Sequence, residues 1–256
     1  MNPTTITLLF LLFAVVMFVF EKIPLGVTSM IGVAAKSGYS RSRLLMPLVF
    51  AAAMGGNLSL IGAPGNLIAQ SALEEMNLSF GFFEYAIVGM PILICGILFY
   101  ATVGYRFLPN KKVSGDGGTL SLASALSQTG AGAMIAETVM GALGESPSPY
   151  VLTFVVFILC CIMTNFMSNT ATTALMVPIC LSIAQGMGAD PRAVLMACVI
   201  GGSCAYATPI GMPANTMVVG AGGYTFMDYV KSGLPLIVIA TIVSMVILPI
   251  AFPFFP

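Results

Sequence analysis

Apolar runs separated by short charged connections make up nearly all of this sequence. The runs occupy residues 4–20, 44–73, 85–105, 120–143, 193–222 and 234–253. A helix needs about 20 mostly apolar residues to cross the hydrocarbon core of a bilayer, so these runs have the length of membrane spans. Only 7% of the residues are charged, whereas a soluble domain uses about 25%. The sequence therefore predicts an all-α polytopic membrane protein, which we place in the cell (inner or plasma) membrane.

The same composition argues against several classes of function. The formal net charge is zero, so nucleic acid is not an expected partner. Histidine is absent and the six cysteines lie in apolar stretches without metal-binding spacing, which leaves no metal site of the usual kind. Asp116, Asp190 and Asp228 all fall in predicted connections. We therefore expect neither an enzyme nor a chain that needs an organic cofactor.

Two of the apolar runs are interrupted by similar segments. GGNLSLIGAPGN occupies residues 55–66 and GGSCAYATPIGMPAN occupies residues 201–215, and their Gly-X-Pro-X-Asn endings lie 149 residues apart. Lipid cannot satisfy free backbone groups, so a helix broken at membrane depth must be buried in protein or line a wet cavity. The helix ends at such a break attract anions or cations. Paired discontinuous helices are typical of secondary transporters, although glycines here also suit tight helix packing.

Basic loops give the expected orientation and domain organisation. Residues 36–43 and 106–112 are basic, which favours a cytoplasmic position and makes the two interrupted helices run in opposite directions, as in an inverted repeat. The predicted domains are an incomplete first repeat at 1–112 (broken helix at 55–66), a linker at 113–119, and a second repeat at 120–256 (hairpin at 151–184, broken helix at 193–222).

The hairpin prediction comes from a polar stretch between two short apolar segments. TNFMSNTATTALMVPI, residues 164–179, is rich in Thr, Ser and Asn and has no charge. Its neighbours, 151–163 and 171–184, are each about 20 Å long as helices, which is less than the about 30 Å of a bilayer core. We therefore predict a re-entrant hairpin whose tip meets the break at 201–215. Neutral oxygens there can coordinate sodium or bond an anion, with polar bonding between helices as the alternative.

The hairpin triplet Ser168-Asn169-Thr170, the later GMPAN and the earlier LIGAPGNLIAQ together resemble the divalent anion:sodium symporters of the ion transporter superfamily. The resemblance implies sodium as the coupling ion and a small divalent anion as the substrate. The implied sodium-binding positions are Thr164, Ser168, Asn169, Gly211 and Gly62. The implied substrate-binding positions are Ser168, Asn169, Thr170, Pro213, Asn215, Ala63 and Pro64. The family's other Ser-Asn-Thr hairpin has no counterpart before the first broken helix, so the chain resembles a shortened member.

The resulting hypothesis is a sodium-coupled symporter of dicarboxylates, citrate or sulfate that forms a homodimer in the membrane. An anion or solute channel is one alternative, because paired half-helices with Asn-containing loops also build pores. A truncated remnant that does not transport is the other. Sodium dependence and saturable uptake would separate the first two hypotheses.

Overall fold

The computed structural model describes residues 40–110, 131–142 and 148–254, and the elements in these ranges are all helical. This confirms the predicted all-α class. Three predicted features lie outside the described residues. They are the run at 4–20, the region before residue 36 where the family's other hairpin has no counterpart, and the linker at 113–119. Of the run at 120–143, the structure describes helix α7, Ala131–Gly141.

Both interrupted runs fold as two helices separated by unwound chain, as predicted. In the first half, α3 (Arg41–Gly55) is followed by a 3₁₀ turn, η1 (Gly56–Leu58), and then by α4 (Pro64–Glu74). In the second half, α10 (Pro191–Gly202) precedes α11 (Pro213–Gly222). Residues 56–63 form the first break and residues 203–212 form the second. A proline begins the helix after each break, where its fixed φ suits a helix and its missing N–H costs nothing.

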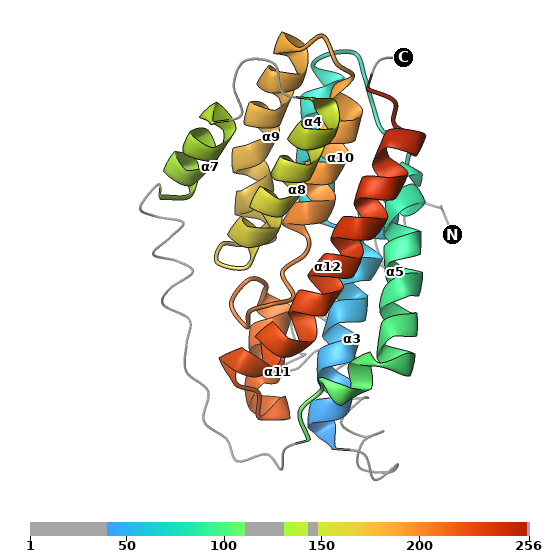
Figure 1. Cartoon of the computed structure of the whole chain (residues 1–256), viewed down its shortest axis with the longest axis vertical. Helices are drawn as coiled ribbons and strands as arrows, with labels where there is room; N and C mark the ends of the chain where they lie inside the picture. The colour runs from blue at the N-terminus through green and yellow to red at the C-terminus, as the bar shows by residue number, and fades with distance from the viewer. Residues whose placement is uncertain (1–39, 111–130, 143–147, 255–256) are drawn as a thin grey trace, which may run out of the picture.

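The polar stretch forms the turn of a helical hairpin. The arms are α8 (Pro149–Thr164) and α9 (Asn169–Gly186), so the tip consists of residues 165–168. Ser168 caps α9, because its Oγ accepts a hydrogen bond from the N–H of Ala171 at 3.1 Å. In Figure 1 both arms lie in one half of the molecule and the tip lies near mid-length, beside the chain that leaves α10. The depth of this tip in a bilayer stays a prediction.

Among the described residues, two helices have the length and hydropathy of membrane spans. They are α5 (Glu84–Thr102), with a mean hydropathy of 1.9, and α12 (Phe226–Ala251), with 2.6. A short turn, η2 (Gly104–Arg106), follows α5. The predicted start of the last helix at residue 234 was wrong. The charges in its first turns are typical of a loop, but Thr225 and Asp228 form a capping box. The box satisfies the N–H groups of these two residues and starts the helix at Phe226.

Helix α10 forms the centre of the fold. All its residues from Ala193 to Gly202 are buried, and it packs against α8, α9, α4 and α12. Figure 1 places α4 and α10 in one half of the molecule and α3 and α11 in the other. The first broken helix therefore runs in the direction opposite to the second. This is the relative direction that the basic loops predict, whereas the inverted arrangement in a membrane stays a prediction.

Candidate functional site

A single asparagine joins the hairpin tip to the second break. The Asn165 amide nitrogen donates to the carbonyl oxygens of Cys161 at 2.7 Å and Cys204 at 3.1 Å. Its side-chain oxygen accepts from the N–H of Ala207 at 2.8 Å, and the Thr208 hydroxyl donates to the Asn165 carbonyl. Asn165 is only 5% exposed. The hairpin tip thus supplies hydrogen bonds that an unwound segment inside a membrane cannot obtain from lipid.

Three neutral oxygens meet where α8 ends. Thr164 Oγ1 lies 2.7 Å from Asn169 Oδ1 and 2.6 Å from the carbonyl oxygen of Gly202. A hydroxyl has one hydrogen, so it can donate to only one of these two acceptors. Gly202 is the last residue of α10, where helix carbonyls lack partners and carry partial negative charge. The group therefore offers more oxygen lone pairs than hydrogens, which is an arrangement that suits a small cation.

Gly211 lets the second break approach the hairpin. A Cβ atom on this residue would lie 2.6 Å from the carbonyl oxygen of Thr164 and 2.8 Å from the Cβ of Ala205. The N–H of Gly211 also donates to the Thr208 hydroxyl at 3.2 Å. The structure thus brings together Thr164 and Gly211, two of the residues that the sequence predicts for sodium. A larger residue at position 211 would push the tip and the break apart.

The other predicted residues of the tip lie at helix N-termini. Ser168 and Thr170 are exposed and Asn169 is half-buried where α9 begins, and Pro213 is exposed at the first position of α11. Free N–H groups and the positive end of the helix dipole make such ends favourable for an anion. This part of the structure can therefore attract an anion without a fixed positive charge.

Asn215, predicted as a substrate contact, braces the second break from inside. It is fully buried, and its amide nitrogen donates to the carbonyl oxygens of Ala205 at 2.7 Å and Thr208 at 2.9 Å. The Tyr229 hydroxyl on α12 donates to the Asn215 carbonyl at 2.7 Å. One turn later on α12, Gly233 contacts the break so closely that a Cβ atom would collide with its backbone.

The same brace holds the first break, 149 positions earlier. Asn66 is fully buried and donates to the carbonyl oxygens of Gly56 at 3.2 Å and Ser59 at 2.7 Å. The Tyr85 hydroxyl on α5 donates to the Asn66 carbonyl at 3.0 Å, and Gly89 contacts the break as Gly233 does. We name these two sets the first and second asparagine braces.

The sequence contains a signal for both braces outside the two Gly-X-Pro-X-Asn segments. FFEYAIVGMP at 82–91 and FMDYVKSGLP at 226–235 share their Phe, Tyr, Gly and Pro positions. The internal similarity therefore extends from the breaks into the helices that follow them. Asn165 was not predicted either. It stands inside the polar stretch, but its role depends on hydrogen bonds to the second break, which is distant in the sequence.

The first break is more open than the second. Gly62 and Pro64 are exposed, Ala63 is half-buried, and Ile61 is 67% exposed. The close contacts of Gly62 are with Gly56 of the same break. Contact with the hairpin is made one residue past Pro64: a Cβ atom on Gly65 would lie 2.8 Å from Oγ1 of Thr173 in α9. The predicted residues 62–64 therefore lie at the surface, whereas Gly211 is buried against the hairpin.

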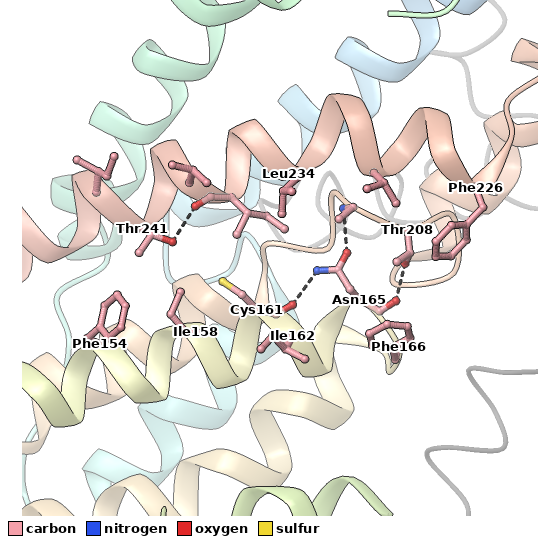
Figure 2. Close-up of a pocket in the computed structure, with 15 residues that line it drawn as sticks. Phe154, Ile158, Cys161, Ile162, Asn165, Phe166, Thr208, Phe226, Leu234 and Thr241 are labelled. Atoms are coloured by element: carbon pink, nitrogen blue, oxygen red, sulfur yellow. Dashed lines mark hydrogen bonds between the residues drawn. The ribbon is translucent and has the colours of Figure 1, made fainter. Parts of the chain in front are cut away.

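An apolar cavity of about 500 Å³ lies between α8 and α12 (Figure 2). Asn165 and Thr208 line it where the hairpin tip meets the second break. Apolar side chains of the two helices form most of the remaining wall, among them Phe154, Ile158, Leu234 and Val238. Residues 168–170 and 211–215 do not line this cavity. It is lined instead by their chain neighbours Asn165, Phe166 and Thr208.

One ion pair lies at the turn between α9 and α10. Arg192 donates to the Asp190 carboxylate with an N···O distance of 2.6 Å, and Asp190 also caps α10 by accepting from the N–H of Arg192. Partial burial acts to raise the pKa of the Asp190 carboxyl, but these hydrogen bonds outweigh it and hold the pKa below its usual value. We call the contact between the hairpin tip and the second break the joint. It contains only uncharged residues, namely Thr164, Asn165, Thr208 and Gly211.

Known proteins match both halves of the chain. The family described as the sodium:sulfate symporter transmembrane region matches residues 115–252, and the citrate transporter family matches residues 3–115. An uncharacterized transporter of Escherichia coli (strain K12) is 38% identical over 137 residues, which cover 54% of this chain and 22% of that protein. An uncharacterized transporter of Methanocaldococcus jannaschii is 26% identical over 264 residues, covering 73% and 59%. The sodium-dependent dicarboxylate transporter of Staphylococcus saprophyticus is 29% identical over 139 residues, covering 52% and 26%.

A helical membrane protein with broken helices and a polar-tipped hairpin has the architecture of a secondary transporter, and these relatives are transporters, not enzymes. The chain belongs to the sodium:sulfate symporter family, whose match extends over more than half of its residues. This confirms the resemblance to the divalent anion:sodium symporters. The chain spans only 22% to 59% of the length of the relatives named above. The two family matches meet at residue 115, within the predicted linker, while the domain boundaries stay a prediction.

Proposed function

We propose that this chain provides sodium-coupled symport of a small divalent anion, such as a dicarboxylate, citrate or sulfate, across the plasma membrane. The observation that carries the proposal is the oxygen group at Thr164, Asn169 and Gly202, which lies where the hairpin meets a broken helix. Half-helix C-terminal ends and unwound carbonyls coordinate sodium in other transporters. A sodium ion there would supply the positive charge that the uncharged joint lacks.

The anion would bind beside this ion, at the N-termini of α9 and α11. Ser168, Thr170 and Pro213 are exposed there, and the dipoles of both helices favour negative charge. The sodium ion and the anion would then attract each other across a short distance. Sodium binding would thus strengthen anion binding and the reverse, which is the reciprocity that coupled transport requires.

A thermal melt of the purified protein tests the sodium site. A ligand that binds only the folded state at about a hundred times its dissociation constant adds about 2.7 kcal/mol, so sodium should raise the unfolding temperature more than an equal concentration of potassium. Thr164→Val keeps the shape of the side chain and removes its hydroxyl, so it should abolish the difference between the two ions.

The matched control is Thr153→Val on the same helix. Thr153 is also buried, and its hydroxyl donates to the Pro149 carbonyl at 2.8 Å, away from the tip. Thr153→Val should lower the melting temperature in both salts and leave the difference between sodium and potassium unchanged. Equal melts in sodium and potassium for the unmutated protein would refute the proposed sodium site.

Uptake by reconstituted vesicles tests the transport itself. Labelled sulfate, citrate and a dicarboxylate should enter only with an inward sodium gradient, and entry should saturate with substrate. Flux that is independent of sodium and does not saturate would favour the channel alternative. The absence of any flux, together with a sodium-specific melt, would mean that the site is retained and the transport cycle is not.

A further inference from the structure

We infer that the cavity between α8 and α12 binds one acyl chain of a membrane lipid. The cavity has a volume of about 500 Å³ and is lined mainly by apolar side chains of these two helices (Figure 2). The inference concerns lipid binding and stands independently of the proposed sodium-coupled transport. Three properties of the cavity identify the occupant: its polarity, its opening and its size.

The polar side chains in the wall are already paired. Asn165 uses its amide nitrogen twice and its side-chain oxygen once. Thr208 donates to the Asn165 carbonyl, and Thr241 donates to the carbonyl of Ile237 at 2.8 Å. A polar ligand or a group of waters would find no unpaired side-chain partner among these residues and would lose hydrogen bonds on entering. The occupant is therefore apolar.

The cavity opens onto an exposed apolar surface, which would face lipid in a bilayer. Its wall includes Val238, 51% exposed, and Ile242, 60% exposed, on the membrane-span helix α12, and Phe154, 47% exposed, on α8. These exposed apolar side chains continue the outer surface of α12 into the cavity. In a bilayer, the molecules that reach such an opening are lipids, whose acyl chains carry no hydrogen-bonding group.

The size fits one acyl chain better than a helix. At about 30 Å³ for a water-sized group, the cavity holds on the order of sixteen methylene groups, which is the length of a common acyl chain. A helix about 10 Å across with a pitch of 5.4 Å fills about 400 Å³ per turn, so the cavity would hold little more than one turn. A helical segment of this chain or of a second copy therefore fits poorly.

An acyl chain in this position would contact both the hairpin and the span. The wall joins α8 to α12, and Asn165 and Thr208, which fasten the tip to the second break, form part of it. The bound lipid would therefore strengthen the packing of the hairpin against α12 by burying apolar surface of both helices.

Tryptophan fluorescence can test this directly, because the sequence contains no tryptophan. Phe154→Trp places a single reporter in the cavity, and Phe226→Trp is a second reporter at another lining position. Leu98→Trp on α5 is the control, since Leu98 is 56% exposed and does not line the cavity. The probe is phosphatidylcholine with brominated acyl chains, added in increasing mole fraction to the purified variants in detergent.

Quenching at the two cavity positions should saturate at a low mole fraction of the probe, whereas quenching at the control should rise in proportion to it. Adding Val238→Phe to Phe154→Trp narrows the cavity and should weaken the saturating part. Proportional quenching at all three positions would overturn the inference. So would weaker quenching in the cavity than at the control, because that result means that protein, and not lipid, fills the space.

Discussion

Hydroxyl side chains near the hairpin tip have different roles according to their burial. Ser168 and Thr164 both bear hydroxyls near the tip, but Ser168 is exposed and caps α9, whereas Thr164 is buried among acceptors. Replacing a capping serine by alanine costs about 1 kcal/mol, so Ser168→Ala would weaken the fold as well as any ion site. Thr164 is therefore the sharper position at which to test the proposed function.

We predict that a single methyl group added at Gly211 would force the hairpin tip and the second break apart. The Cβ of Gly211→Ala would lie 2.6 Å from the Thr164 carbonyl oxygen, and backbone must move to relieve that contact. A melt should show a destabilisation of about 1–3 kcal/mol, as for other overpacked sites, and loss of any sodium-specific shift. Gly220→Ala in α11 is the control, because nothing lies within 4 Å of its Cβ and alanine favours a helix by up to about 1 kcal/mol. Equal effects of the two substitutions would contradict this reading of Gly211.

The two asparagine braces predict a paired result at the tyrosines. Tyr229→Phe and Tyr85→Phe each remove one hydrogen bond to a brace, so each should cost about 0.5–1.5 kcal/mol in a thermal melt. Only Tyr229→Phe should also reduce a sodium-specific shift, since the second break contacts Thr164. Tyr150→Phe, at a ring that is 61% exposed, should change little. A large loss at Tyr229 with none at Tyr85 would show that the braces are not equivalent.

At the scale of the elements, the sequence predicted the helices that apolar runs mark and the breaks that Gly, Pro and Asn mark. Gly, Pro and Asn located both breaks, because a proline at the start of a helix and an unwound glycine segment leave a strong local signature. The start of α12 was mispredicted because the charges of Asp228 and Lys231 resemble a loop, whereas Asp228 acts as part of a cap. The asparagine braces were not predicted. Their tyrosine bonds join different helices, and the sequence marks them only through the repeat of residues 82–91 at 226–235.

The turn between α9 and α10 should make stability depend on pH. Because the folded state lowers the pKa of Asp190 below 3.8, the unfolded state binds more protons, and stability is lost as the pH falls through the folded pKa. Unfolding temperatures should therefore fall as the pH is lowered below about 4, the ordinary pKa of an aspartate. Asp190→Asn keeps a capping acceptor and removes the charge. The variant should therefore be less stable than the unmutated protein at pH 5, and its stability should fall less as the pH is lowered further. An unchanged pH profile in that variant would exclude Asp190 as the source.

At the scale of the whole molecule, the two halves share a brace but differ in what covers the break. Gly211 is buried against the hairpin, whereas Gly62, its equivalent 149 positions earlier, is exposed beside Ile61. The hairpin tip is hydrogen-bonded to the second break through Asn165, whereas the contact of the hairpin with the first half is made by Thr173 in α9 with Gly65, just past the first break. An exposed unwound segment has backbone groups that lipid does not satisfy. Such a segment must be covered by protein or line a wet cavity, and under the homodimer hypothesis a second copy of the chain would cover it.

Amide hydrogen exchange of the protein in detergent should reveal this asymmetry. Amides of the first break, 56–63, should exchange faster than those of the second, 203–212, because the second is hydrogen-bonded to the hairpin tip, whereas Ile61 and Gly62 of the first are exposed. If two copies cover the first break, its exchange should slow as protein concentration rises and as light scattering reports a dimer, while the second break stays unchanged. Equally slow exchange at both breaks in a compact monomer would contradict the proposed partner. It would mean that the asparagine brace alone, Asn66 with Tyr85, is enough to protect a break from solvent and detergent.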